Sequence, residues 1–296
     1  MSDHLKAVLI VVISGLIWSF GALVVKHMAD PQLYQLPYLV IRGSTVALII
    51  GLFLLVNEKK DFFLNLIKID RISVIGGLSL TTAMMGFIYS ISYTTAAVTL
   101  FMLALMPFLA SLIAYIFVKE KISLQNFLSM IIALIGAIII IYASAFSGSI
   151  FGLVMGFISS LGFATFSVAL RTKSNFKKFY ILIYAGLFCA IISLSLMIFN
   201  GQELYLPLKN IFLSITHGVI VAIGLILFSF GSKHLLSGEL TMLSLLEVVG
   251  GILWAWLPIL GINEVPSLNT IIGGIVICLA IVVNSFRLNK EELKSN

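Results

Sequence analysis

Ten long apolar segments, each close to the length that crosses a lipid bilayer as a helix, dominate this chain. The hydrocarbon core of a bilayer is about 30 Å thick and is crossed by about 20 residues of α-helix. The segments that fit this length are residues 7–28, 38–56, 72–92, 95–117, 124–143, 150–170, 179–199, 211–232, 239–261 and 268–286. Strands of a transmembrane β-barrel are about 10 residues long and alternate strictly between polar and apolar residues. The sequence therefore predicts an all-α, polytopic membrane protein with ten transmembrane helices.

The composition agrees with a membrane location. Hydrophobic residues make up 60% of the 296 and charged residues only 10%, whereas a soluble domain carries about 25% charged residues. The chain has no P-loop, HExxH or GxSxG motif, its four histidines are far apart, and Cys189 and Cys278 form no CxxC pair. We therefore predict no catalytic constellation, metal or cofactor. The net charge of +6 comes from scattered residues, so no nucleic-acid partner is predicted.

The basic residues are concentrated in the loops on one side of the predicted helices. Of the 18 Lys and Arg residues, 15 lie on the side that the termini share, Lys26 and Lys209 lie on the other side, and Arg42 lies within a segment. Cytoplasmic loops carry an excess of Lys and Arg. We therefore expect both termini, with a tail of residues 287–296, to be cytoplasmic in a multi-pass protein of the inner (cytoplasmic) membrane. The 15 are Lys6, Lys59, Lys60, Lys68, Arg71, Lys119, Lys121, Arg171, Lys173, Lys177, Lys178, Lys233, Arg287, Lys290 and Lys294.

The chain also repeats itself. Residues 14–26 align with residues 159–171, and residues 103–123 align with residues 243–267. The alignments keep their order along the chain, which indicates a tandem duplication of a five-helix unit. Because five is an odd number, the second copy enters the membrane upside down relative to the first, as in many secondary transporters. The predicted units are residues 1–143 and 150–286, with their last helices at the periphery of a central polar cavity.

The two copies resemble the repeat of the drug/metabolite transporter superfamily, in its ten-helix EamA-type family, over nearly the whole chain. Some of the features that carry the resemblance occur in both copies and some in one. They are an aromatic and a downstream basic residue in the first helix of each copy, an Arg in the second helix, a Leu-Glu-Pro-like segment, and an acid before each last helix. The residues are Trp18 with Lys26, Phe163 with Arg171, Arg42, Leu246 to Val248, Glu120 and Glu264. Val248 replaces the usual proline, and Tyr184 stands where the second copy's counterpart of Arg42 is sought.

Resemblance to that superfamily implies export or uptake of a small metabolite, amino acids among them, by alternating access or facilitated passage. Members also carry nucleotide sugars, cations and drugs, so the substrate and the direction are not predicted, and neither is the oligomeric state. Since no nucleotide-binding segment is found, concentrative transport would draw on a gradient, for which protons are a candidate. The alternatives are a membrane-embedded enzyme acting on a lipid-linked substrate and a membrane protein without transport.

Glu247 is the strongest candidate for a functional residue. It lies eight residues into segment 239–261, where a carboxylate costs about 2.5–3.5 kcal/mol unless it is paired, protonated or in a water-filled cavity. At about 1.5 Å per residue, Glu247 lies roughly 20 Å and Arg42 about 8 Å below the outer face. This separation suits a small zwitterion whose carboxylate meets Arg42 and whose ammonium group meets Glu247. The alternatives are structural pairing or capping for Glu247, and, for Arg42, snorkelling to the outer interface or tethering of a neighbouring helix.

Four further residues are candidates for lining the cavity. Trp18 lies near mid-depth and aligns with Phe163, although isolated aromatic residues also pack in cores. His217 is a candidate proton relay or a hydrogen-bonded structural histidine. Met84 suits an adaptable wall and is equally ordinary in an apolar helix. Pro107, midway along its segment, is expected to kink the helix.

Polar residues near the segment ends have structural interpretations. Ser123 and Ser267 are expected to begin the helices that follow them, because Ser is a good N-cap. Glu120 and Glu264 precede them and are expected to favour the same helix N-termini. Arg171, at a helix end, is expected to snorkel to the membrane interface.

Small residues recur at four-residue spacing in the second and sixth segments, as Gly43, Ala47 and Gly51 and as Gly152 and Gly156. Such spacing permits close contact between helices. We interpret these residues as sites of helix packing.

We predict that the loops near residues 60, 120, 174 and 235 face the cytoplasm. Single cysteines placed there, in a chain whose native cysteines are replaced by alanine, should react with a membrane-impermeant maleimide only after permeabilisation. A cysteine at Lys209 should react in intact cells. Labelling of the 57–71 loop in intact cells would show that the orientation is the reverse.

Overall fold

The computed structural model describes residues 2–94, 96–143, 149–173, 176–260, 265 and 267–286. Within these residues the fold is all-α, as the sequence predicts. The tail of residues 287–296 and Glu264 lie outside the described residues. The helices are α1 (Asp3–Trp18), α2 (Phe20–Lys26), α3 (Gln35–Glu58), α4 (Asp61–Ile67), α5 (Arg71–Tyr93), α6 (Ala96–Leu103), α7 (Met106–Val118), α8 (Leu124–Ala143), α9 (Ile150–Arg171), α10 (Lys177–Phe199), α11 (Leu208–Gly231), α12 (Ser237–Ser244), α13 (Leu246–Trp256) and α14 (Leu268–Phe286), with a 3-10 turn η1 at Pro258–Leu260.

Eight spans of the described chain are long and apolar enough to cross a bilayer, so this is a multi-pass membrane protein. They are Asp3–Lys26, Gln35–Glu58, Arg71–Tyr93, Phe101–Val118, Ile150–Arg171, Lys177–Phe199, Leu208–Gly231 and Ser237–Trp254. The fifth and tenth predicted segments form α8 and α14, which hold shorter apolar stretches at Leu124–Ile140 and Leu268–Asn284. The short helix α4 was not predicted.

Three of the spans are interrupted, which the sequence did not predict. Helix α1 passes into α2 at Ser19, α6 into α7 at residues 104–105, and α12 into α13 at Leu245. Pro107 lies at the start of α7, where its missing N–H costs nothing because the first N–H groups of a helix have no partner within it. The chain is therefore interrupted just before Pro107 instead of bending at it.

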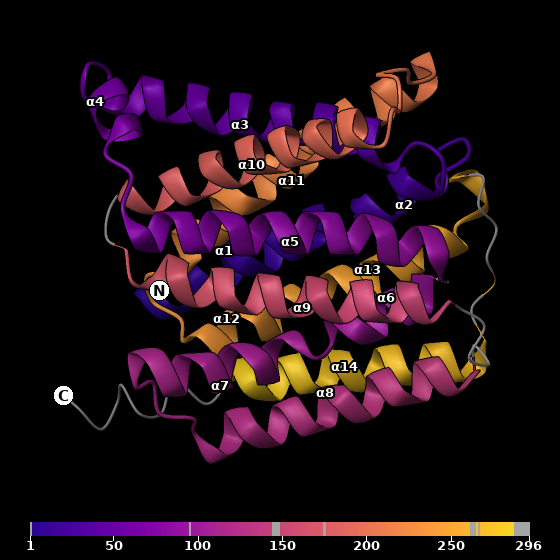
Figure 1. The fold of residues 1–296 in the computed structure, drawn as a ribbon. Coiled ribbons are helices and arrows are strands. Elements are labelled where there is room, and N and C mark those ends of the chain that lie inside the picture. The colour runs from indigo at the N-terminus through magenta and orange to yellow at the C-terminus, as the bar shows by residue number, and fades with distance from the viewer. Residues whose placement is uncertain are drawn as a thin grey trace.

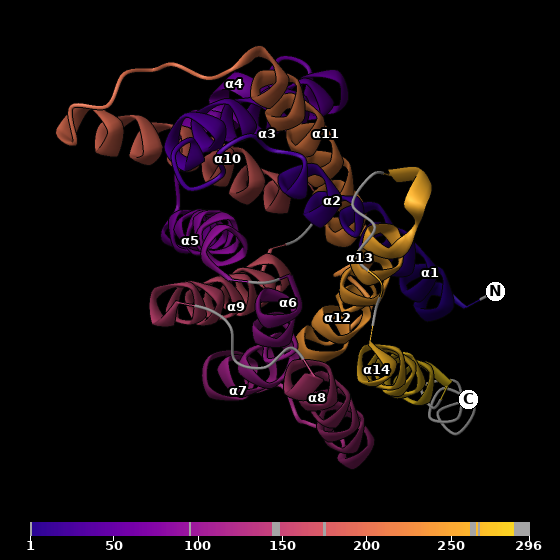
Figure 2. The ribbon, with the colours of Figure 1, turned by 90° about the vertical axis from the view of Figure 1, so that its right-hand side faces the viewer.

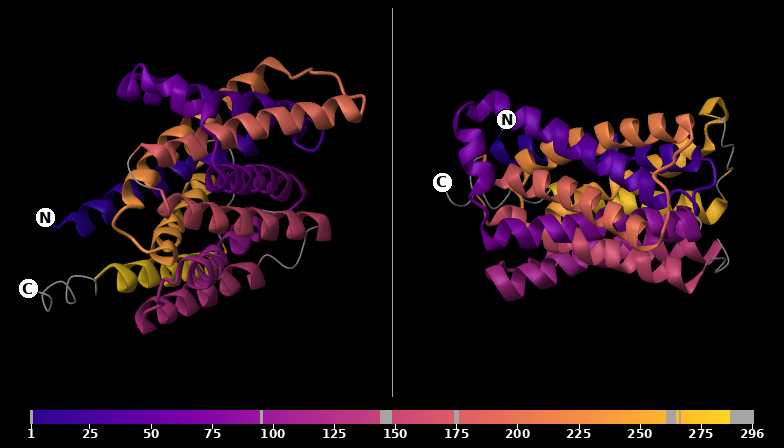
Figure 3. Two further views of the ribbon diagram at one scale, coloured as in Figure 1. Left: turned by 60° about the vertical axis from the view of Figure 1, so that its left-hand side comes forward. Right: turned by 45° about the horizontal axis from the view of Figure 1, so that its top comes forward.

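The helices run side by side along one direction, with the start of α1 and the end of α14 at the same end of the bundle (Figures 1 and 3). The connections α3–α4–α5, α7–α8 and α11–α12 lie at that end, and α2–α3 and α10–α11 lie at the other (Figure 1). We call the first the basic end, because its loops carry Lys59, Lys60, Lys119, Lys121 and Lys233. The gathering of basic loops at one end agrees with the predicted topology, whose cytoplasmic assignment stays a prediction.

Viewed along the helices, α8 and α14 lie together at the outside of the bundle, and α3 crosses α10 on another side (Figure 2). The helix backbones are in close contact both where α3 crosses α10 and where α8 crosses α14. A Cβ atom added to Gly43 would lie 2.8 Å from the Gly186 carbonyl oxygen, and one added to Gly273 would lie 2.4 Å from the Gly136 carbonyl oxygen. Small residues thus let these helices approach closely, as predicted for Gly43. Gly51, in contrast, has nothing within 4 Å of such an atom.

The predicted serine caps are confirmed. The Ser123 hydroxyl accepts the Asn126 N–H at 3.1 Å, and the Ser267 hydroxyl accepts the Thr270 N–H at 3.2 Å. Each satisfies one of the N–H groups that the first turn of a helix leaves unpaired.

Asp70 caps α5 and also ties it to the end of α9. Its carboxylate accepts the N–H groups of Ile72 and Ser73 at 3.0 and 3.1 Å and pairs with Lys173 at 2.5 Å. Partial burial opposes ionisation, but the hydrogen bonds from Lys173 and Ser73 outweigh it and lower the pKa of Asp70 to about 2. The positive charge of Lys173 is therefore paired with the ionised Asp70 carboxylate at neutral pH.

The α8–α14 crossing yields a paired test. Gly273→Ala should destabilise the protein by about 1–3 kcal/mol, because the new methyl group must displace the α8 backbone. Gly274→Ala is the matched control, since nothing lies within 4 Å of its added Cβ, and alanine favours the helix. Thermal unfolding of both variants in detergent measures the difference. Equal melting temperatures would contradict the close backbone contact.

Candidate functional site

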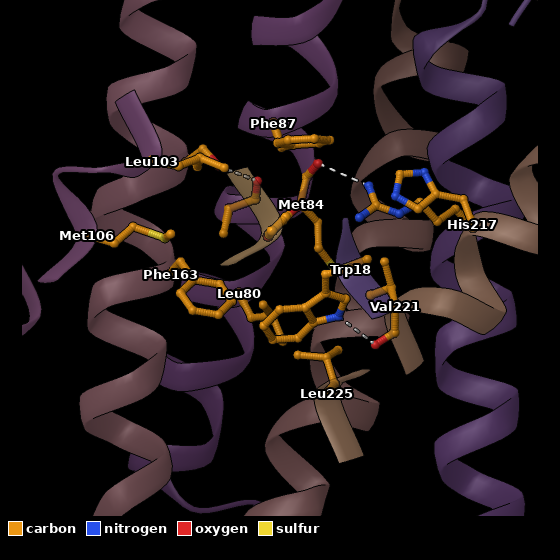
Figure 4. Close-up of a pocket in the computed structure, with 14 residues that line it drawn as sticks. Trp18, Leu80, Met84, Phe87, Leu103, Met106, Phe163, His217, Val221 and Leu225 are labelled. Atoms are coloured by element: carbon orange, nitrogen blue, oxygen red, sulfur yellow. Dashed lines mark hydrogen bonds between the residues drawn. The ribbon is translucent and has the colours of Figure 1, made fainter. Parts of the chain in front are cut away.

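A cavity of about 70 Å³ lies among the helices, which is several times the 10–15 Å³ or so that one water needs. All six residues predicted for the transport site line it, whereas Pro107 does not. Figure 4 shows Trp18 and Phe163 close together, with His217 across the pocket from Phe163 and Met106. The lining residues are Trp18, Arg42, Met84, Phe163, His217 and Glu247, together with Leu80, Ala83, Phe87, Leu103, Met106, Ser159, Val221 and Leu225.

Glu247 reaches the cavity from the first turn of α13, directly after the interruption at Leu245. The N-terminus of a helix carries a partial positive charge, which stabilises a carboxylate there. The interruption of the span therefore lowers the cost of an acid at mid-membrane depth. The side chain is half-buried and makes no ion pair with any residue that the structure describes.

Arg42 approaches the same cavity from α3 and is only 4% exposed. Its Nη1 donates to the Met84 carbonyl oxygen at 3.3 Å, while its buried Nε has no partner. Such burial does not fit the snorkelling alternative. Within the described part of the chain, Arg42 and Glu247 are not bonded to each other, although each lies within the electrostatic field of the other.

His217 on α11 is held by a hydrogen bond between its Nδ1 and the Tyr38 hydroxyl at 2.9 Å. Both side chains are buried. A Cβ atom added to Gly21 would lie 3.0 Å from His217 Nε2, so α2 passes close to the ring. The imidazole therefore borders the cavity in a fixed orientation. Nothing in the sequence indicated Tyr38 as its partner.

Aromatic rings close the cavity toward the basic end. The ring of Trp18 meets Phe163 edge-on at 5.6 Å and Phe228 at 5.3 Å, and its Nε1 donates to the Val221 carbonyl oxygen at 3.3 Å (Figure 4). Phe163 also contacts Phe166 and Phe228 at 5.5 and 5.3 Å. Since α9 and α11 both end at the basic end, Phe166 and Phe228 lie beyond Trp18 in that direction.

An ion pair and a hydrogen bond join the α7–α8 connection to α9 and α12 at the basic end. Arg171, the last residue of α9, donates from Nε to Glu120 Oε1 at 2.8 Å, and Glu120 Oε2 accepts the N–H of Ser237, the first residue of α12, at 3.0 Å. Glu239 in the same helix pairs with His4 of α1 at 2.8 Å. Two expectations were therefore wrong. Glu120 binds α12 instead of favouring the start of α8, and Arg171 has an internal partner instead of snorkelling.

Two buried serines make equivalent bonds in the two halves of the chain. The Ser14 hydroxyl donates to the Gly224 carbonyl oxygen at 2.8 Å, and the Ser159 hydroxyl donates to the Ala83 carbonyl oxygen at 2.9 Å. Ser14 and Ser159 are aligned in the internal repeat. Ser159 lines the cavity and was missed, although its match with Ser14 was the signal that could have found it.

Comparison with known proteins relates the first half of the chain to a family of transporters. The model of the EamA-like transporter family matches residues 5–142, which is nearly the whole first predicted unit. The pseudopaline exporter CntI of Pseudomonas aeruginosa strain PAO1 is 24% identical over 199 residues, covering 67% of this chain and 69% of that protein. The protein of the same name from strain UCBPP-PA14 is 24% identical over 201 residues.

A solved crystal structure has the same fold. It superposes with a TM-score of 0.74 at 17% identity and covers 97% of this chain and 98% of that chain. This likeness concerns the fold alone, whereas the family match and the exporters exclude the alternative of a membrane-embedded enzyme. Residues 5–142 match the EamA-like transporter family and the similar curated proteins are exporters, which indicates that this chain is a membrane transporter.

Proposed function

We propose that this protein exports a small zwitterionic metabolite, such as an amino acid, across the cytoplasmic membrane by alternating access through the central cavity. The observation that carries the proposal is that the Arg42 guanidinium and the Glu247 carboxyl group line one cavity, with no ion pair between them in the described chain. A buried charge without a partner is costly. A ligand with a carboxylate and an ammonium group would neutralise both.

The direction and the substrate class rest on separate support. The two similar curated proteins are both named exporters, which favours export here. Their names specify pseudopaline, and at 24% identity we do not extend that substrate to this chain. The aromatic side chains of Trp18, Phe163 and Phe87 favour a metabolite with an apolar part beside its two charges.

We further propose that ten transmembrane helices form two inverted units, residues 1–143 and 150–286. Three pairs of features support this arrangement. Ser14 and Ser159 make equivalent hydrogen bonds. Spans α6–α7 and α12–α13 are interrupted at aligned positions. The second helices of the two units cross at a pair of glycines, and so do the fifth helices. Interrupted helices bordering a site between inverted repeats are typical of secondary transporters.

Transport in this scheme requires the closed basic end to open. The cavity of about 70 Å³ is small for a metabolite with a side chain. Passage to the basic end would require the Trp18–Phe163–Phe228 cluster to separate and the Glu120–Arg171 ion pair to break. His217 is our candidate for a proton site, because its ring lines the cavity that also holds Arg42 and Glu247 and is oriented by Tyr38.

The first test identifies the substrate class by thermal shift. Amino acids and related zwitterions are screened on detergent-solubilised protein, because a ligand that binds only the folded state raises its melting temperature. A zwitterion that stabilises the protein, while its esterified and N-acetylated forms do not, is the expected result. Stabilisation by both modified forms would contradict recognition of the two charges.

Glu247→Gln should lower transport of that zwitterion into proteoliposomes by about 10- to 100-fold, the equivalent of one charge-assisted hydrogen bond of about 1.5–3 kcal/mol. Folding should be little affected, because Gln keeps the shape and hydrogen-bonding capacity of the side chain. Glu203→Gln, in the exposed α10–α11 connection, is the control. Transport by Glu247→Gln at the wild-type rate at every pH would remove Glu247 from the mechanism.

Glu120→Gln should favour opening of the basic end, since it removes the charge that pairs with Arg171. A cysteine at the cavity residue Leu225 should then react severalfold faster with a membrane-impermeant maleimide added from that end. Labelling in vesicles of defined orientation measures the rate. An unchanged rate in Glu120→Gln would show that this ion pair does not hold the end closed.

A further inference from the structure

A second pocket, of about 590 Å³, lies at the basic end between the end of α9, the start of α10 and the end of α11. Half of its lining residues are basic and three are phenylalanines. None of them lines the central cavity, so the two sites are distinct. The lining residues are Arg171, Lys173, Lys178, Lys233, Phe176, Phe179, Phe230 and Ser232.

Two of these cations are not neutralised by the described chain. Arg171 pairs with Glu120 and Lys173 pairs with Asp70, whereas Lys178 and Lys233 have no ion pair with any residue in the described ranges. Asp3 of α1 is a nearby acid and is exposed. It interacts electrostatically with Lys233 but forms its ion pair with Lys6. The pocket therefore carries excess positive charge.

The excess positive charge is costly at Lys178, because this residue is only 6% exposed and water cannot solvate its charge fully. Its ammonium group donates to the Ser229 carbonyl oxygen and lies 3.5 Å from the Ser232 hydroxyl. These are neutral partners, and a buried cation is normally paired with an anion. Arg171 Nη1 is also buried without a partner. The pocket thus holds a buried ammonium group without a counter-ion on α10 and an unpartnered guanidinium nitrogen on α9.

The other wall of the pocket is aromatic and reaches the outer surface of the bundle. Phe179 contacts Phe176 at 5.9 Å, Phe230 at 5.2 Å and Phe53 of α3 at 5.1 Å. Phe230 is 43% exposed, and on a membrane-spanning helix such a surface meets lipid chains. A bound molecule would therefore have an anionic group at the lysines and an apolar part along Phe230.

We propose that this pocket binds an anionic phospholipid, with its phosphate at Lys178 and Lys233 and an acyl chain along Phe230 and Phe53. Basic pockets between transmembrane helices at an anionic membrane surface recognise lipid headgroups. The exposed aromatic wall favours a lipid over free phosphate, which has no apolar part to cover it. The proposal does not depend on the transported substrate.

The test compares phosphatidylglycerol with phosphatidylcholine of the same acyl chains on the purified full-length protein. Native mass spectrometry should show one retained phosphatidylglycerol, and thermal shift should show stabilisation by this lipid alone. Lys233→Gln, an exposed change that leaves folding intact, and Lys178→Gln should each weaken the affinity about fivefold, as expected for one basic residue. Lys60→Gln, an exposed lysine of the same end outside the pocket, should bind as the wild type.

Three results would overturn the proposal. Equal stabilisation by the two lipids would exclude headgroup recognition. Stabilisation by inorganic phosphate equal to that by phosphatidylglycerol would make this a soluble-anion site. Wild-type affinity of Lys233→Gln for phosphatidylglycerol would place the lipid elsewhere. Because Lys233 is exposed, this last comparison remains decisive if Lys178→Gln fails to fold.

Discussion

The cost of placing polar groups inside a membrane is the constraint on which this structure depends. Most buried polar side chains of the described chain meet it with a nearby carbonyl oxygen, as Ser14 and Ser159 do. Glu247 offsets the cost of a polar group in the membrane in another way, because the interruption at Leu245 places its carboxylate in the first turn of α13. Arg42 is satisfied only in part. Arg42 and Glu247 are thus brought together at the central cavity, where a ligand can complete their pairing.

Close backbone packing holds this cavity between rigid walls. Gly224 shows the mechanism, since a Cβ atom there would lie 2.2 Å from the indole nitrogen of Trp18. The missing side chain lets Trp18 of α1 approach α11, reach the Val221 carbonyl oxygen and contact Phe163 edge-on and Phe228 at a tilt. A transporter needs such a wall to switch between discrete arrangements, and interlocked rings on separate helices can part as units.

Much of the fold and the site could be predicted from the sequence, because long apolar segments mark membrane spans and charged residues within such segments are rare. Length and apolarity predicted where the helices lie, and Glu247 and Arg42 were conspicuous among apolar residues. The interruptions at Ser19 and Leu245 could not be predicted, because neither carries a proline and both depend on contacts between helices, such as that of Trp254 with the Ser19 hydroxyl. The Glu120–Arg171 pair was missed for the same reason, since its residues are far apart in the sequence.

The closed basic end and the proposed lipid site share a residue, and this couples them physically. Arg171 uses Nε to bind Glu120 while its Nη1 stays without a partner beside the pocket. A lipid phosphate at Lys178 and Lys233 would lie beside Arg171 without using the Nε that binds Glu120, so lipid binding would leave that ion pair in place. By linkage, a ligand that favours one arrangement of a two-state protein shifts the population toward it. Under the proposed lipid site, the lipid's differential affinity for the closed and open arrangements would set both the direction and the size of the shift.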